Sequence, residues 1–154
     1  MEMIKADLCG QENYTRPDNE MQIVFDSKSE NEAFARMATA AFVSCLNPTV
    51  EELADIKTAV SEAVTNCIIH GYDQGTGKIF LECEIYGKLF AVAVTDEGRG
   101  IADIDQAMEP LFTTRPELER SGMGFSFMQA FMDSVEVESE PGKGTRVVMC
   151  KEIG

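Results

Sequence analysis

Hydrophobic residues recur along this chain with two periods, one typical of helices and one typical of strands. Between residues 53 and 68 they return every three or four positions, which predicts a helix with one buried face. Thr49 and Glu52 precede this run with the spacing of a capping box, and Pro48 blocks an earlier start. We therefore predict a helix that begins after Thr49 and continues to about Ile68.

A second amphipathic helix is predicted after Ser29. Ser29 and Glu32 have the spacing of another capping box. The residues expected to turn inward are Phe34, Met37, Ala41 and Cys45. The other face carries Glu32 and Arg36, which we expect to be exposed. A third helix is predicted over residues 122–132, with Ser121 as its cap.

The remaining apolar runs have the β-branched or alternating character of strands. Gly87 and Lys88 separate two of them in the manner of a tight hairpin. The predicted strands are 21–26, 78–86, 89–95, 135–139 and 146–151. Together with the helices they predict a two-layer α/β sandwich, in which a mixed, mostly antiparallel sheet has its helices packed on one face.

The length of 154 residues suits a single domain, which we place at residues 19–154. Residues 1–18 are polar with little periodicity, and we interpret them as a disordered N-terminal extension or the result of an upstream start codon. No apolar run approaches the length of a membrane span, and a net charge of −14 disfavours direct binding to nucleic acid because phosphates would be repelled. Five cysteines without a C-x-x-C pair favour reduced thiols, so we expect a cytoplasmic protein.

Glu62 and Asn66 carry the first candidate chemistry, because they stand at i and i+4 of the helix after Thr49 and project from nearly the same face. They flank the apolar stripe, where a cleft would lie. A carboxylate there can accept a proton, and a neutral amide oxygen can ligate Mg²⁺ without adding negative charge beside phosphates. The same pair also occurs as a solvated Glu and Asn in ordinary helices, so alone it decides little.

Three glycine-bearing loops follow, 96–100 (DEGRG), 121–125 (SGMGF) and 141–145 (PGKGT). In the first, Asp96 ends a strand and can accept a hydrogen bond from an exocyclic amine such as that of adenine, while Gly98 and Gly100 let the backbone approach a flat ring. The second opens backbone N–H groups at the positive end of a helix, which forms an anion site. The third is a Gly-Thr hairpin between strands. Each loop alone also fits an ordinary turn.

The order of these elements is more specific than any of them alone. Here the sequence resembles the GHKL superfamily of ATP-binding proteins, and most closely its anti-sigma-F branch, whose members are serine kinases that also sequester an RNA polymerase sigma factor. The likeness covers roughly residue 19 to the C-terminus, and the lid-like segment LFTTRPELER is its most specific part. It rests on the runs 29–36, 48–53, 57–72 and 111–125.

The resemblance implies a role for each candidate residue. Glu62 would be the general base that activates a substrate hydroxyl, and Asn66 would be the Mg²⁺ ligand. Asp96 would bind the adenine amino group. The adenine pocket would be completed by Gly98, Gly100 and Thr145. The phosphates would be held, under a closing lid, by Ser121, Gly122, Met123 and Gly124. Charge on the γ-phosphate would be neutralised by Arg120 or Arg115.

The implied function is an ATP-dependent serine kinase that also binds and inhibits the sporulation sigma-F factor. Its substrate would be a serine on an anti-anti-sigma protein, with ATP or ADP and Mg²⁺ as cofactors. A homodimer is expected, and the face with Glu32 and Arg36 would help form the dimer or the sigma-binding surface. Two alternatives stay open: a stress-response switch kinase of the same branch, and an anti-sigma protein that holds ATP without kinase activity.

Overall fold

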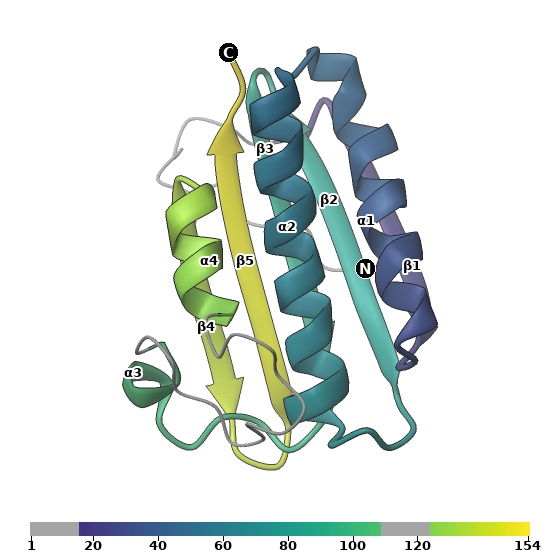
Figure 1. Cartoon of the computed structure of the whole chain (residues 1–154), viewed down its shortest axis with the longest axis vertical. Helices are drawn as coiled ribbons and strands as arrows, with labels where there is room; N and C mark the ends of the chain where they lie inside the picture. Colours follow the sequence, from purple (N-terminus) through teal and green to yellow (C-terminus); the bar gives the residue numbers. More distant parts are fainter. Residues whose placement is uncertain (1–15, 109–123) are drawn as a thin grey trace.

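One sheet and a layer of helices make up the described part of the chain, residues 16–108 and 124–154 of a computed structural model (Figure 1). The helices lie on a single face of the sheet, so the predicted two-layer α/β sandwich is confirmed. The strands are β1 (Asn19–Asp26), β2 (Lys78–Tyr86), β3 (Leu89–Asp96), β4 (Ser134–Glu140) and β5 (Gly144–Glu152). The helices are α1 (Glu30–Val43), α2 (Val50–Asn66), α3 (Ile104–Ala107) and α4 (Gly124–Phe131), with short turns η2 (Ser44–Leu46) and η3 (Cys67–Gly71).

The strands follow the order β1-β2-β3-β5-β4, and all four neighbouring pairs are antiparallel. The sheet is therefore antiparallel throughout, where the sequence left room for a mixed one. β2 and β3 form the predicted hairpin, which turns at Gly87 with a φ of 61°. Because β5 pairs with β3, the end of β3 lies beside the start of β5, and these two strand ends form the floor of the site described below.

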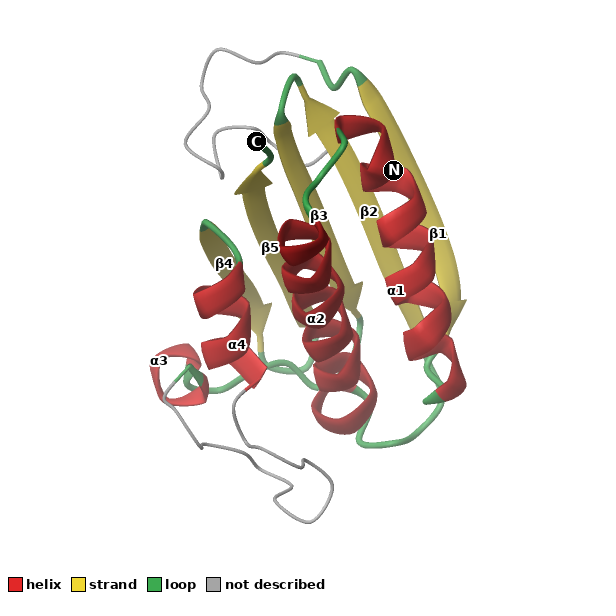
Figure 2. Cartoon of the chain, turned by 45° about the horizontal axis from the view of Figure 1, so that its top comes forward, coloured by secondary structure: helices red, strands yellow, loops and turns green. Residues whose placement is uncertain are grey.

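Helix α2 is the centre of the helical layer and lies between α1 and α4 (Figure 2). Its buried stripe consists of Ile56, Ala59, Val60, Ala63 and Val64. The predicted capping box is present: Thr49 Oγ1 accepts from the backbone of Glu52 at 3.0 Å, and Glu52 Oε1 accepts from Thr49 N–H at 2.8 Å. Beyond Asn66 the helix widens into the π-helical turn η3, a feature that often occurs at functional sites.

Helix α1 has its predicted position but not its predicted orientation. The residues that face inward are Ala35, Thr39 and Val43, whereas Phe34 is 50% exposed and Met37 60% exposed, and Ala41 and Cys45 are exposed as well. Ser29 does not use its side chain as a cap, since it has helical dihedral angles and makes no capping bond. The inner face of α1 thus carries residues of small to medium size, which pack against the sheet. The larger side chains of Phe34 and Met37 face solvent instead.

Glu32 and Arg36 form an ion pair on α1, with Arg36 Nη1 2.9 Å from Glu32 Oε1. The same nitrogen donates to Ser61 Oγ of α2 at 3.3 Å. The side chains are 36% exposed for Arg36 and 25% exposed for Glu32. The pair therefore lies at the seam between the two helices and is only partly exposed, where full exposure was expected.

The second face of the sheet carries its own buried cluster, which includes Tyr86, Ala93 and Val148. Cys150 belongs to this cluster and is disulfide-bonded. The expectation of reduced thiols is thus wrong for Cys150, while Cys45, Cys67 and Cys83 are free.

The N-terminal extension predicted for residues 1–18 lies almost wholly outside the described residues. Asp18 is described and is hydrogen-bonded to the sheet just before β1 begins, because its N–H donates to the Ile85 carbonyl at 2.6 Å and its carboxylate accepts from Gly87 N–H at 2.6 Å. Across the described ranges, none of the helices has the length and apolar character needed to cross a membrane.

Candidate functional site

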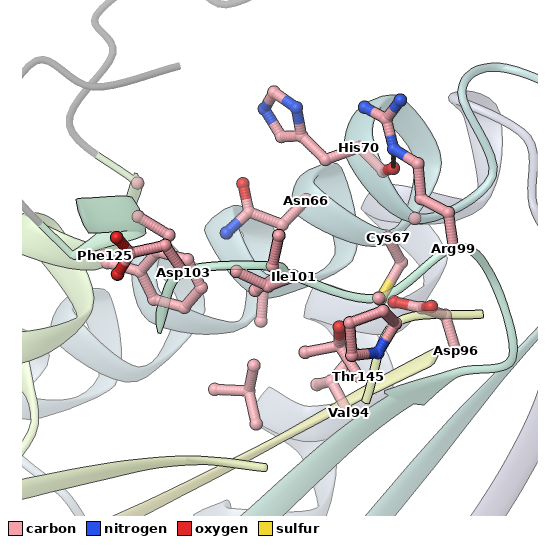
Figure 3. A pocket seen from close by; sticks show the side chains of 18 of the residues that line it. Asn66, Cys67, His70, Val94, Asp96, Arg99, Ile101, Asp103, Phe125 and Thr145 are labelled. Atoms are coloured by element: carbon pink, nitrogen blue, oxygen red, sulfur yellow. Dashed lines mark hydrogen bonds between the residues drawn. The ribbon is translucent and has the colours of Figure 1, made fainter. Parts of the chain in front are cut away.

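A cavity of about 410 Å³ opens where α2 and η3 meet the ends of β3 and β5 and the start of α4. Its volume is in the range of small-molecule binding sites. Figure 3 shows side chains from all of these elements around one space. The apolar part of the wall includes Ala63, Val94, Ile101, Phe125 and Val147. Such a lining suits a flat, largely apolar ring, and the polar groups at its margins decide which ring binds.

Asp96 provides the polar group at the floor of the cavity. It is the last residue of β3, is only 4% exposed and stands directly opposite Thr145 of β5. Its Oδ1 accepts from the Gly98 N–H at 2.9 Å, and it accepts further bonds from the Cys67 thiol and the Thr145 backbone. Burial raises the pKa of the Asp96 carboxyl above its ordinary value, and these donors oppose the rise.

Two glycines allow the chain to close around this carboxylate. A Cβ at Gly71 would lie 2.7 Å from Asp96 Cγ, and a Cβ at Gly98 would lie 2.0 Å from the Gly71 carbonyl oxygen. Gly98 does not line the cavity. We predicted that it brings the backbone close to a ring, but in the structure it brings the loop after β3 against η3 and anchors Asp96 with its N–H.

Gly100 and Thr145 lie where the loop after β3 meets the turn between β4 and β5, and both line the cavity. Gly100 has a φ of 75°, and a Cβ there would lie 2.3 Å from the Glu140 carbonyl oxygen. Thr145 Oγ1 lies 2.8 Å from Ser139 Oγ, which also accepts from Ile101 N–H at 2.7 Å. Ser139 of β4 thus links the loop after β3 to the start of β5. No local pattern in the sequence predicts this role.

Glu62, Asn66 and Gly124 meet at the other end of the cavity. A Cβ at Gly124 would lie 3.3 Å from Asn66 Oδ1 and 3.4 Å from Glu62 Oε2, so both side chains reach the first residue of α4. Asn66 and Gly124 line the cavity, while Glu62 stands just behind the lining and reaches toward Gly124. The amide nitrogen of Asn66 is buried and has no hydrogen-bond partner within the described part of the chain. An amide left in this state in a cavity points to a ligand that completes its bonds.

Two further residues near the site, Arg99 and Tyr72, were not predicted to hold it together. Arg99 donates from Nε to the His70 carbonyl at 2.7 Å, the bond drawn in Figure 3, and its own N–H donates to the Gly71 carbonyl at 2.9 Å. Tyr72 accepts from the Glu97 N–H at 2.7 Å and donates to the Lys78 carbonyl. These bonds tie η3 to the loop after β3, and they arise from tertiary contacts that sequence spacing does not reveal.

Five of the predicted site residues lie outside the described residues: Arg115, Arg120, Ser121, Gly122 and Met123. The roles assigned to them remain predictions. Of the connection predicted to act as a lid, the described beginning contains the short helix α3, capped by Asp103, whose Oδ1 accepts from Gln106 N–H at 3.0 Å.

Comparison with known proteins agrees with this arrangement. The model of the histidine kinase-like ATPase domain family matches residues 25–151. An anti-sigma F factor of Thermoanaerobacter sp. (strain X514) is 62% identical over 136 residues, which cover 88% of this chain and 95% of that protein. The anti-sigma F factor of Clostridium kluyveri is 60% identical over 134 residues, which cover 87% of this chain and 94% of that protein.

A solved structure of the RsbU and RsbW domains of a Mycobacterium tuberculosis protein shares the fold. Its TM-score is 0.64 at 19% identity, over 89% of this chain and 32% of that chain. Together with the cavity and the sequence matches, these findings establish the family: the chain belongs to the anti-sigma F factors, within the histidine kinase-like ATPase domain family.

Proposed function

We propose that this protein is an ATP-dependent serine kinase that phosphorylates an anti-anti-sigma protein and that also binds and inhibits a sporulation sigma factor. The observation that carries the kinase proposal is the division of one cavity into two ends. A buried carboxylate, Asp96, lies at one end, and Glu62, Asn66 and Gly124 meet at the other. A nucleotide has the same division, with a flat amine-bearing base at one end and phosphates at the other.

At the base end, the exocyclic amine of adenine donates to Asp96. A purine with a carbonyl at this position offers no donor and faces a buried carboxylate, so the site selects adenine. Gly100 and Thr145 hold the adjoining backbone segments in place.

At the phosphate end, the N-terminus of α4, which begins at Gly124, would supply a partial positive charge and backbone N–H donors. Asn66 would hold a Mg²⁺ ion through its amide oxygen, which faces the start of α4, since a Mg²⁺ bound to phosphates needs only one or two protein ligands. Its buried Nδ2 lacks a partner among the described residues and is a donor that suits a phosphate oxygen. The ion would supply charge neutralisation on the phosphates. Ser121, Gly122 and Met123 would add further backbone donors, and Arg115 or Arg120 a cation for the γ-phosphate.

Glu62 has the position of a general base. Its carboxylate reaches the start of α4, which is the end of the cavity assigned to the γ-phosphate. There it can accept the proton of a serine hydroxyl while the hydroxyl oxygen attacks phosphorus. Phosphoryl transfer demands mainly positioning and charge stabilisation, so one base and a well-held nucleotide suffice.

Replacing Glu62 tests the kinase mechanism. We expect Glu62→Gln to lower the rate of phosphoserine formation on an anti-anti-sigma protein by about a hundredfold or more, because it removes the general base. Affinity for ADP should stay within about twofold of wild type, since an isosteric amide preserves packing. Glu51→Gln, an exposed change on the same helix, serves as the matched control. Equal rates for Glu62→Gln and wild type would exclude the mechanism, and ADP binding without any transfer by wild type would favour the alternative that holds ATP without kinase activity.

The protonation of Asp96 predicts how nucleotide affinity depends on pH. The ionised carboxylate accepts from adenine, and burial raises the pKa of Asp96, so protonation on acidification begins at a higher pH than for an ordinary aspartate. Affinity for ADP should therefore fall on acidification, and the fall should begin at a higher pH than for an ordinary aspartate, whose pKa is about 3.9. Isothermal calorimetry on wild type and Asp96→Asn checks this. The variant should bind ADP roughly tenfold or more weakly at neutral pH and should show only the pH dependence of the phosphates; a wild-type profile that parallels the variant would contradict the assignment.

The sigma partner is assigned to the seam between α1 and α2. The names of the closely related proteins point to a sigma factor, and a chain with a net charge of −14 attracts a basic, DNA-binding partner. Glu32 and Arg36 present an acceptor and a donor, held in place by Ser61. Binding a transcription factor would also place the protein in the cytoplasm.

Removing the arginine tests this surface. We expect Arg36→Ala to weaken binding of the sporulation sigma factor by about tenfold, the cost of losing a central polar contact, and to leave ADP affinity unchanged. Surface plasmon resonance with immobilised sigma factor measures the first, and calorimetry the second. Lys28→Ala, an exposed cation just before α1, should behave as wild type. If Arg36→Ala binds the sigma factor normally, the contact surface lies elsewhere.

The homodimer is assigned to the exposed apolar side of α1, with a second copy of the chain as its occupant. Phe34 and Met37 are half exposed or more on one helix, and Phe34 lies beside the edge strand β1, where its ring is 6.3 Å from the Phe25 ring. Exposed apolar patches of this kind mark protein interfaces.

A charge placed in this side of α1 should separate the copies. We expect Met37→Glu to sediment as a monomer under conditions in which wild type is a dimer, because it would bury a carboxylate at the interface. Val50→Glu changes an 88% exposed apolar residue outside α1 and should remain dimeric. Analytical ultracentrifugation of all three proteins decides the point, and a dimeric Met37→Glu protein would rule out this interface.

A further inference from the structure

Cys67 lies beside the carboxylate at the base end of the cavity, although no part of the proposed chemistry uses it. It is the first residue of η3, is only 3% exposed and lines the same cavity as Asp96. Figure 3 shows its sulfur next to the Asp96 carboxylate, at a position from which the thiol can donate a hydrogen bond to that carboxylate. The thiol carries the proton of this bond, because a carboxylate is an acceptor only.

The bond from Cys67 differs in kind from the other bonds that hold Asp96. Gly98 and Thr145 donate from backbone N–H groups, which a side-chain substitution at those positions would not remove. Of the donors to Asp96 in the described part of the chain, the thiol is the one that depends on residue type. The π-helical turn brings it there, since Cys67 directly follows the last residue of α2.

The orientation of Asp96 matters because a carboxylate can rotate about its terminal bond, and that rotation has broad preferences. The backbone donors restrain it from the side of the strands and the loop after β3, and Gly71 packs against its Cγ. The thiol acts from the side of the helix. Loss of this donor would leave the carboxylate with one fewer restraint in a buried site.

We propose that Cys67 is a positioning residue for base recognition: its thiol donates to Asp96 and orients the carboxylate toward the exocyclic amine of a 6-aminopurine. This inference rests on the proposed role of Asp96 as the adenine acceptor. Cys67 does not itself contact the base amine. Replacing Cys67 should therefore change the affinity only for ligands that carry the amine. A residue that merely fills space would affect ligands with and without the amine equally.

Two nucleotides and three variants test the proposal. The dissociation constants of ADP and of purine riboside diphosphate, which lacks the amine, are measured by calorimetry for wild type, Cys67→Ala, Cys67→Ser and Cys83→Ala. We expect Cys67→Ala to weaken ADP binding by about fivefold, the usual worth of one hydrogen bond, and to leave the analogue unchanged. Cys67→Ser keeps a donor and should retain most of the preference for ADP. Cys83 is a buried free cysteine that does not line the cavity, so Cys83→Ala should match wild type.

The outcomes separate this inference from the function on which it rests. If wild type binds the analogue as tightly as ADP, Asp96 does not read the amine, and both proposals are overturned. If wild type prefers ADP and Cys67→Ala keeps the full preference, or weakens both ligands equally, only the role of Cys67 is overturned. Loss of preference in Cys67→Ala with its retention in Cys67→Ser supports the inference.

Discussion

The packing of α2 against the sheet is the interaction on which the rest of the structure depends. Ile56, Val60 and Val64 are fully buried on its inner face, and each such side chain contributes about 1.5–3 kcal/mol relative to exposure. This burial fixes the rotation of the helix about its own axis. Because helical residues follow a strict period, fixing the buried stripe also fixes the flank that carries Glu62 and Asn66. The same helix end then leads into η3, which delivers Cys67 and Gly71 to the floor of the cavity.

The site carries a local free-energy cost, the burial of a carboxylate, which offsets part of the stability that this core provides. A carboxylate that is 4% exposed has lost most of its hydration, and the rise in the pKa of Asp96 is the direct sign of that loss. Hydrogen bonds from Gly98, Cys67 and Thr145 offset part of this desolvation cost. Glycine at positions 71 and 98 is the condition for this arrangement, since side chains there would meet Asp96 or the backbone. The requirement for glycine at these two positions therefore follows from the burial of one carboxylate, that of Asp96.

The elements with a strong periodic signal could be predicted from the sequence. α2 and its capping box, the hairpin of β2 and β3 and the one-sided helical layer follow from residue spacing and turn residues. α1 shows the limit of such reasoning. It has apolar or small residues on two stripes, so its period predicts a helix without deciding which stripe is buried, and packing against the sheet selected Ala35, Thr39 and Val43. In the site, Asn66, Asp96 and Thr145 stand at motif positions, whereas Cys67, Ser139 and Tyr72 act through partners distant in sequence, which no local pattern encodes.

Under the proposed function, the net charge of the chain favours a neutral side chain at position 66. With 27 acidic and 13 basic residues, the protein repels a nucleotide at long range, so the phosphate end needs local positive potential. Among the described residues of that end, the N-terminus of α4 supplies such potential, and Glu62 already contributes a negative charge. A second carboxylate at position 66 would add to this repulsion. The neutral amide of Asn66 avoids the added charge and, in the mechanism that we propose, would still offer its oxygen to a cation.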